Sequence, residues 1–401
     1  MNKINAELLA PAGSFESLEA ALRFGADAVY IGGPFMQLRA ESAGFSADDV
    51  RRAAQTAHRA GKRLYVAVNC FARNDELAPL ADYAAALHEL GVDAAIVSDL
   101  GALRVMRRAC PALELHVSTQ ANVTNYETAR LYYELGAKRI VLAREATVAE
   151  IREIRANIPP ALELECFVHG AMCMSYSGQC LISSYLNGRS GNRGECTQPC
   201  RWHYKLLEEK RPGVYYDVIE EDGSSAILSS HDLCCIDMLD ELADAGVCSF
   251  KIEGRMKTAY YVATVTNAYR CRMDGLGSPE ALRRELNCVS HRPYSTGFYY
   301  GVEKLRHAND GNYTADARFT AVVTRVLPDG RAELEMRNRF ADGETLEVLT
   351  PGQTGRPFTV RELRDEAGEP TAEAYIPCQR VTVSQDGTLR AGDLLRRAES
   401  E

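Results

Sequence analysis

The sequence predicts a (β/α)8 TIM-like barrel over residues 1–312 and a small all-β domain, a β-barrel, over residues 313–401. Short apolar runs of β type alternate eight times with amphipathic helical stretches, which is the pattern of parallel βα units. From about Ala315 this pattern gives way to alternating strands separated by Pro-Asp-Gly and Gln-Asp-Gly turns. A chain of 401 residues also exceeds the usual size of one hydrophobic core, so a large and a small domain are expected.

The first βα unit shows the features that define the others. An apolar run, Glu7–Pro11, precedes a helix over Ser14–Gly25, with Ser14 as N-cap and Gly25 as terminator. The remaining strands are expected at residues 28–33, 63–69, 94–99, 115–121, 139–144, 162–169 and 250–255. Further helices are expected at residues 77–90, 100–109, 126–135, 148–157 and, after the eighth strand, through Tyr269.

A doubly wound sheet would use the same alternation of strands and helices. Its dinucleotide-binding form carries a G-x-G-x-x-G turn after the first strand, and this chain has none there. The barrel is therefore the preferred fold, and the doubly wound sheet is the alternative.

An insertion of residues 170–249 separates the seventh and eighth strands. It is far longer than an ordinary βα connection, and loops of this length are usually functional or form an inserted subdomain. The insertion contains four cysteines, then a polar stretch, then residues 229–246, which are expected to form a capped helix.

Polar residues recur where the predicted strands end, on the face where barrel enzymes build their sites. They are Asn69, Asp99, Gln120, Arg144, His169 and Glu253. On the seventh strand, a period of two places Glu165, Phe167 and His169 on one face. Glu165 and His169 are therefore either an acid/base pair or a buried, satisfied pair. The chain has neither H-E-x-x-H nor G-x-S-x-G, the usual motifs of zinc proteases and serine hydrolases.

Composition and charge narrow the class of protein. The net charge of −9 argues against a general nucleic-acid binder held by a chain-wide positive field. Neither a membrane span nor a signal peptide is visible, so a cytoplasmic protein is expected. Because thiols stay reduced there, the 13 cysteines are expected to be metal ligands and small buried side chains rather than disulfides.

Cys173, Cys180, Cys196 and Cys200 form a C-x6-C-x15-C-x3-C array in the insertion. Thiolates ligate both iron–sulfur clusters and structural zinc. Structural zinc usually draws its cysteines in pairs two to four apart, and only Cys196 and Cys200 resemble such a pair. An iron–sulfur cluster, a zinc site and buried free thiols all remain open from the spacing. The neighbouring Cys234 and Cys235 are candidate substitutes for one ligand, but the favoured interpretation places them at the start of a helix that packs under the loop.

Basic and aromatic residues alternate in and just after the cysteine array. The basic residues are Arg189, Arg193, Arg201 and Lys205, and the aromatic ones are Tyr176, Tyr185, Trp202 and Tyr204. Such a mixture can hold phosphates and stack bases, or it can be a solvated loop whose aromatic rings shield a cluster.

Long motifs in this chain resemble a known family. The segment from Glu163 to Cys180 reads ELECFVHGAMCMSYSGQC, and it is followed by SSYLNGR, NRGEC and QPCRW. LLAPAG, YIGG, LRA, STQANV, FKIEGRMK and TGFYYG extend the similarity over nearly the whole chain. These motifs are similar to those of the collagenase-like ("unassigned") peptidase family, and most similar to its tRNA-hydroxylating branch.

The resemblance implies an iron–sulfur-dependent tRNA modification enzyme that converts wobble uridine to 5-hydroxyuridine without molecular oxygen, drawing on prephenate. It implies a 4Fe-4S cluster on Cys173, Cys180, Cys196 and Cys200, a small-molecule donor and an electron-transfer partner. His169 and Glu165 would position the donor or move protons. Lys251, Glu253 and Arg255 would line the opposite side of the barrel mouth, and Arg189, Arg193 and Arg201 would bind RNA.

Two small departures from the family pattern occur near the second strand, where Gln37 stands for an expected Gly and Gly44 for an expected Asn. The alternatives are hydroxylation of ribosomal RNA, a peptidase acting on collagen-like chains, and a scaffold whose cysteine loop is held by zinc.

Overall fold

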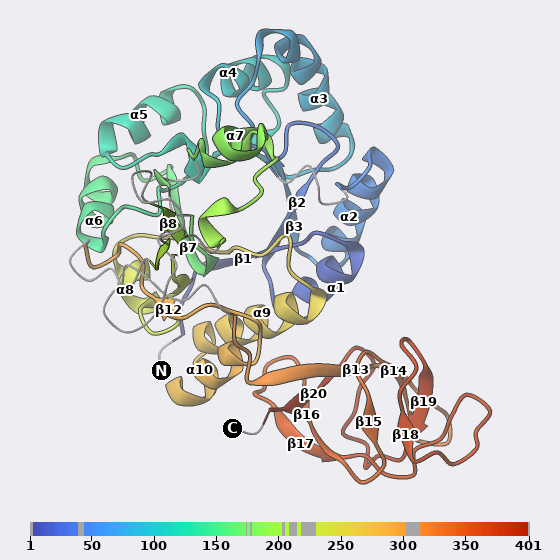
Figure 1. The fold of residues 1–401 in the computed structure, drawn as a ribbon. Helices are drawn as coiled ribbons and strands as arrows, with labels where there is room; N and C mark the ends of the chain where they lie inside the picture. Colours follow the sequence, from blue (N-terminus) through green and yellow to red (C-terminus); the bar gives the residue numbers. More distant parts are fainter. Residues whose placement is uncertain are drawn as a thin grey trace.

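The computed structural model of the chain describes residues 3–38, 44–173, 175–176, 179–202, 205–207, 215–217, 230–301 and 313–399. Its first part is a ring of parallel strands surrounded by helices (Figure 1). The barrel strands are β1 (Glu7–Pro11), β2 (Ala28–Gly32), β3 (Arg63–Val68), β4 (Ala94–Val97), β5 (Glu114–Val117), β6 (Arg139–Val141), β7 (Glu163–Ala171) and β11 (Ser249–Ile252). The ring is closed because β11 pairs with both β1 and β7. The predicted (β/α)8 barrel is confirmed.

Helices cover the outside of the barrel. They are α1 (Phe15–Arg23), α2 (Ala47–Arg59), α3 (Leu77–Glu89), α4 (Leu100–Ala109), α5 (Tyr126–Glu134), α6 (Val148–Asn157), α8 (Leu239–Asp244), α9 (Ala259–Met273) and α10 (Pro279–Asn287). Ser14 caps α1 as predicted. Helix α2 was not among the predicted helices, although Ser46 and Asp49 form a capping box at its start. In the described part of the chain, none of the helices combines the length and apolar character that a membrane span requires.

The barrel strands are buried on both faces, which explains their nearly continuous apolar sequences. The main core lies between the strands and the surrounding helices. A smaller apolar cluster fills part of the barrel interior; it consists of Leu9, Ala28, Tyr30, Tyr65, Ala94 and Ile96. Charged side chains share this interior, and they form the bottom of the site described below.

The end of the insertion differs from its prediction. Residues 229–246 were expected to form one helix, but β10 (Asp232–Cys234) pairs antiparallel with β7, and helix α8 begins only at Leu239. The strand is fixed because Asp232 forms a buried ion pair with Arg292, at 2.7 Å, beside β12 (Tyr294–Ser295). Cys234 is therefore on a strand and not at a helix start. Elsewhere in the insertion, β8 (Lys205–Leu207) pairs antiparallel with β9 (Tyr215–Asp217).

The C-terminal part is an antiparallel sheet, which confirms the predicted all-β domain. Its strands follow the order β17-β16-β20-β13-β14-β19, and β15 pairs with β18. The strands are β13 (Ala317–Val326), β14 (Ala332–Met336), β15 (Phe340–Ala341), β16 (Thr345–Leu349), β17 (Arg356–Thr359), β18 (Glu373–Ala374), β19 (Arg380–Val383) and β20 (Leu394–Ala398). The sheet has its own apolar core.

The sheet domain contacts the barrel through α9 and α10. The rings of Tyr260 and Phe319 stack with centroids 4.9 Å apart, and the fully buried Arg396 pairs with Glu285 at 2.8 Å. The predicted linker through Asn312 falls in residues 302–312, which lie outside the described residues.

Candidate active site

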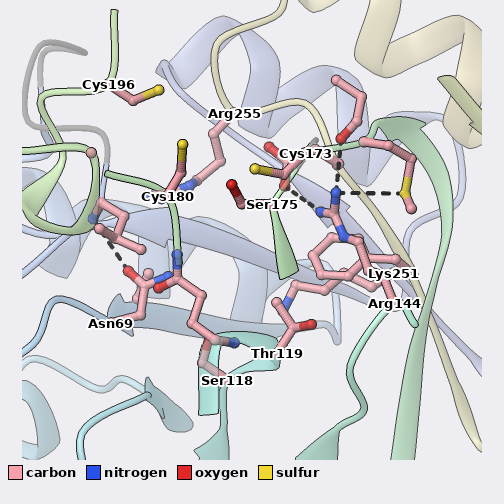
Figure 2. Close-up of a pocket in the computed structure, with 18 of the residues that line it drawn as sticks. Asn69, Ser118, Thr119, Arg144, Cys173, Ser175, Cys180, Cys196, Lys251 and Arg255 are labelled. Atoms are coloured by element: carbon pink, nitrogen blue, oxygen red, sulfur yellow. Dashed lines mark hydrogen bonds and ion pairs between the residues drawn. The ribbon is translucent and has the colours of Figure 1, made fainter. Parts of the chain in front are cut away.

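A cavity of about 170 Å³ lies at the C-terminal ends of the barrel strands, as expected for a barrel of this kind. One side is formed by strand ends, and the other by residues 172–202, here called the Cys loop. Figure 2 shows Asn69, Ser118 and Thr119 on the side opposite Cys180 and Cys196. Four of the six polar residues predicted at strand ends line this cavity; they are Asn69, Gln120, Arg144 and Glu253.

Asp99 and His169 have other surroundings. The Asp99 carboxylate accepts the backbone N–H of Ala102 at 2.8 Å and caps α4. His169 is 1% exposed and packs among the rings of Tyr261, Tyr269 and Tyr294, away from the residues that line the cavity. Neither residue is therefore placed to contact a molecule in the cavity.

The expectation that Glu165, Phe167 and His169 share one face is wrong. Glu165 and Phe167 face the barrel interior, but the pairing of β7 with β11 shifts in register between Lys251 and Ile252. Such a bulge adds a residue to one strand and breaks the alternation of its side chains. The acid/base pair proposed for Glu165 and His169 is thus not brought together.

Glu165 belongs to a buried ionic cluster beneath the cavity, here called the floor network, which comprises Glu7, Arg139, Glu165, Ser249 and Lys251. The Glu165 carboxylate lies 2.9 Å from the Lys251 ammonium and 3.0 Å from the Arg139 guanidinium. Burial opposes ionisation, but these two cations hold the pKa of Glu165 well below its usual range. Glu165 is therefore a fixed negative charge that holds Lys251 at the bottom of the cavity.

Four cationic side chains line the cavity and are here called the cationic wall; they are Arg144, Arg201, Lys251 and Arg255. Two acids, Glu145 and Glu253, line the cavity as well. Arg144 lies 3.9 Å from the centre of the Phe167 ring and donates to the carbonyl of Ala171 at 2.8 Å. Arg144 also contacts the Glu253 carboxylate, at 3.3 Å. This excess of positive charge suits an anionic group on a small molecule.

Arg255 is held by Gln37, one of the two residues that depart from the family pattern. Its guanidinium donates to the side-chain oxygen of Gln37 at 3.1 Å, and both residues are buried. The Gln37 side chain thus positions a cation of the cavity wall, a role that a glycine at this position lacks.

All four cysteines of the array line the same cavity. Backbone N–H groups donate to two of the sulfurs, from Ile182 to Cys180 and from Gln198 to Cys196, each at 3.4 Å. The Ser183 hydroxyl also contacts the Cys196 sulfur, at 3.7 Å. Burial raises the pKa of the Cys173 and Cys200 thiols.

The chemistry of this donor set fits a sulfur-ligated metal group, because hydrogen bonds to sulfur are among the interactions that tune iron–sulfur sites. The side chains are not arranged as a complete metal site. Among the described residues, no three His, Cys, Asp or Glu side chains are grouped closely enough to hold a metal ion. The four sulfurs therefore share one cavity without meeting at one point.

The arginines of the Cys loop are engaged to different degrees. Arg193 binds Glu76 at 2.5 Å and the carbonyl of Phe71 at 2.9 Å, which ties the Cys loop to the segment after β3. Arg201 lines the cavity and donates to the Tyr313 hydroxyl at 2.9 Å. Arg189 is half-buried next to α7 (Ile182–Asn187), with its carbonyl accepting from the Ser184 hydroxyl.

Aromatic and aliphatic side chains are exposed on the same loop. They are Tyr176, Leu181, Tyr185, Leu186 and Trp202, with Tyr185 86% exposed. Lys205 lies on β8, and Tyr204 lies outside the described residues. Figure 1 shows α7, which carries Tyr185 and Leu186, over the open end of the barrel.

Sequence reasoning did not single out Ser118 and Thr119, which line the cavity beside Gln120. Their position in the sequence could have predicted this, because both residues directly follow the apolar run of β5, in the STQANV segment.

Fold and site together define a (β/α)8-barrel protein with a cysteine-lined cavity at the face where barrel enzymes carry their active sites. The chain belongs to Peptidase family U32, whose model matches residues 13–309, and residues 315–396 match the Peptidase family U32 C-terminal domain. The family resemblance inferred from the sequence is confirmed.

Relatives with assigned names differ in what they are said to do. The chain is 33% identical to the tRNA hydroxylation protein P of Escherichia coli, covering 98% of this chain and 97% of that one. It is 38% identical to a 23S rRNA 5-hydroxycytidine synthase of Escherichia coli, over 78% of this chain and 45% of that one. It is 34% identical to a collagenase of Porphyromonas gingivalis, over 99% of both chains.

Proposed function

We propose that this protein hydroxylates uridine in tRNA to 5-hydroxyuridine, without molecular oxygen and with an iron–sulfur cluster. The observation that carries the proposal is that four cysteines and the cationic wall line one cavity in the barrel mouth. Relatives named for tRNA and rRNA hydroxylation support RNA as the substrate, with tRNA favoured by the coverage of nearly the full chain.

In this proposal Cys173, Cys180, Cys196 and Cys200 hold a 4Fe-4S cluster. A bound cluster would supply one-electron chemistry or a Lewis-acidic iron beside the substrate. The chain's own groups bind and orient: Arg144, Lys251 and Arg255 offer positive charge to an anionic donor, and Glu253 and Glu165 hold two of these cations in place.

Prephenate is the proposed donor. It carries two carboxylates and a hydroxyl group, and the cationic wall complements the carboxylates. Replacing the C5–H bond of uridine by C5–OH, with the hydroxyl group taken from the donor, releases the C5 proton and two electrons. The electron-transfer partner of the proposal is therefore an acceptor of two electrons. Arg189 and Arg201, together with the exposed aromatic rings of the Cys loop, would contact the RNA backbone and bases around the cavity entrance.

A peptidase is the second candidate because one relative is named a collagenase. The residues of the site support a peptidase less well than an RNA hydroxylase. Among the described residues, the cavity wall includes no histidine, and the Glu165 carboxylate is committed to two cations. A pair of histidine and carboxylate for acid/base catalysis of peptide hydrolysis is therefore not assembled among the described residues of this cavity.

Mass spectrometry of tRNA nucleosides tests the proposal. Cells lacking the gene should lose 5-hydroxyuridine, the wild-type gene should restore it, and Cys180→Ser should not. Cys378→Ser, at an exposed position of the sheet domain, is the matched control and should restore it fully. Unchanged 5-hydroxyuridine in the deletion strain would refute the function.

Metal analysis tests the cluster separately. Protein purified without oxygen should contain iron and sulfide and absorb visible light, and Cys180→Ser should lower the iron content several-fold. Colourless protein that contains zinc and no iron would refute the cluster.

A further inference from the structure

The cavity has two chemically different walls. The cationic wall comes from β6, β11 and the Cys loop. The opposite wall comes from the ends of β3 and β5 and carries neutral polar groups, namely Asn69, Ser118, Thr119 and Gln120. Figure 2 shows Asn69, Ser118 and Thr119 together on one side, with Arg144 and Lys251 on another. A cavity that binds only a small anion has no need of the second, neutral wall.

The two carboxamides of the neutral wall are positioned by the protein but keep unused hydrogen-bonding capacity. The Asn69 side-chain oxygen accepts the backbone N–H of Leu38 at 3.2 Å, which leaves its NH2 group without a partner among the described residues. The Ser98 hydroxyl lies 3.1 Å from the Asn69 carbonyl and 3.4 Å from the Gln120 side-chain oxygen. Ser98, 4% exposed, therefore holds the two residues side by side.

Amide donors that have no partner among the described residues, beside apolar surface, match the edge and faces of a heterocyclic base. Ala67, on β3 just before Asn69, and Ile96, on β4 between β3 and β5, also line the cavity and offer apolar contact. Bases that undergo chemistry are taken out of their stack into a pocket that reads their hydrogen-bonding edge. Uracil presents the carbonyl oxygen O4 next to C5, where cytosine presents an amino donor.

We propose that Asn69 and Gln120 bind the edge of the target uracil, with the Asn69 NH2 group donating to O4, and that they select uridine over cytidine. This inference rests on the proposed function, because it names the residues that would read the base that is hydroxylated. The neutral wall would bind the base, and the cationic wall would bind the anionic donor. The two substrates thereby meet in one cavity from opposite sides.

Two variants change the hydrogen bonds with little change in shape. Asn69→Asp replaces the donor by an acceptor, which repels O4 and accepts from the amino group of cytosine. Gln120→Met keeps the length of the side chain and removes its polar atoms without adding charge. Each variant is expressed in cells that lack the gene, together with a tRNA that carries either U or C at the target position.

We expect 5-hydroxyuridine to fall ~10-fold in each variant, the scale of one lost base-edge contact. Asn69→Asp should in addition yield 5-hydroxycytidine from the tRNA with C. Affinity of the purified full-length proteins for the same tRNA should stay within about twofold of wild type, because most contacts with RNA are to its backbone. Asn125→Asp and Gln55→Glu, at exposed positions on the helical side, are the matched controls and should match wild type.

The outcomes separate the two proposals. Absence of 5-hydroxyuridine with the wild-type gene would refute the proposed function itself. Wild-type activity together with variants that keep their yield and their preference for U would refute the base-reading role. A variant that loses tRNA affinity to the same extent as its yield would also refute it, since the loss would then be structural.

Discussion

At the floor of the barrel, Arg139 contacts Glu7 and Glu165, and Lys251 contacts Glu165 from the other side. At the mouth, the NH2 groups of Asn69 and Gln120 have no partner in the described part of the chain. Both regions are polar and lie within one barrel, but the floor network is internally satisfied. Polar groups that satisfy one another stabilise the fold, whereas polar groups left with free donors indicate where a ligand binds.

The floor should lose the most stability when its charge balance is broken. Glu165→Gln removes the carboxylate that neutralises Lys251 and Arg139, and both cations are almost fully buried. We expect a loss of ~3–5 kcal/mol in the free energy of unfolding, as for other buried pairs that lose one partner. The measurement is urea denaturation followed by circular dichroism.

The control for this change lies on the same strand. Glu163 also contacts Arg139, but its side chain is 30% exposed, so Glu163→Gln should cost ~1 kcal/mol or less. Equal losses in the two variants would show that the burial of Glu165 does not set its contribution.

The barrel fold and part of the residues at its mouth could be predicted from the sequence. The barrel was predictable because each strand is a local apolar run, and Asn69, Gln120, Arg144 and Glu253 were predictable because strand ends meet on one face. The four cysteines were found from spacing and residue type. These signals are local in the chain.

The errors have a common physical origin in contacts between distant segments. His169 turned away from the cavity because of a register shift between β7 and β11, which no pattern within β7 reveals. Residues 232–234 became a strand because Arg292, 60 positions away, pairs with Asp232. The orientation of the Asn69 and Gln120 carboxamides likewise depends on Leu38 and Ser98, which only the folded chain brings to them.

The pH dependence of stability should come partly from His169, which lies behind the cavity and apart from the floor. Burial lowers its pKa to about 3; Asp232 acts in the opposite direction, and His291 and Lys257 add to the lowering. Because the folded pKa lies below the unfolded value of ~6.5, this contribution to stability is present above pH 6.5 and is lost as the pH falls towards 3.

His169→Asn tests this window. Between pH 6.5 and pH 4.5 the wild type should lose ~2 kcal/mol more stability than the variant. The floor network changes stability in a lower pH range than His169 does. Because the pKa of Glu165 is depressed, its contribution to stability is lost only as the pH falls below the ordinary carboxyl pKa of ~4.3. Parallel stability curves for wild type and His169→Asn above pH 4.5 would contradict the assignment.

The smallest expected effect on stability concerns the contact between Arg193 and Glu76, which joins the Cys loop to the strand ends of the opposite wall. This pair is partly exposed, so Arg193→Met and Glu76→Gln should each change the free energy of unfolding by ~1 kcal/mol or less. If Arg193 serves only to hold the Cys loop in place, both variants should accelerate amide exchange in residues 179–201 to a similar extent, and the two variants should have the same affinity for tRNA.

If instead Arg193 binds a phosphate, Arg193→Met should weaken tRNA binding and flatten its salt dependence. Glu76→Gln should have neither effect, because removing the Glu76 carboxylate frees the Arg193 guanidinium. The two variants thus decide whether this arginine belongs with the satisfied charges of the floor or with the ligand-binding groups of the mouth.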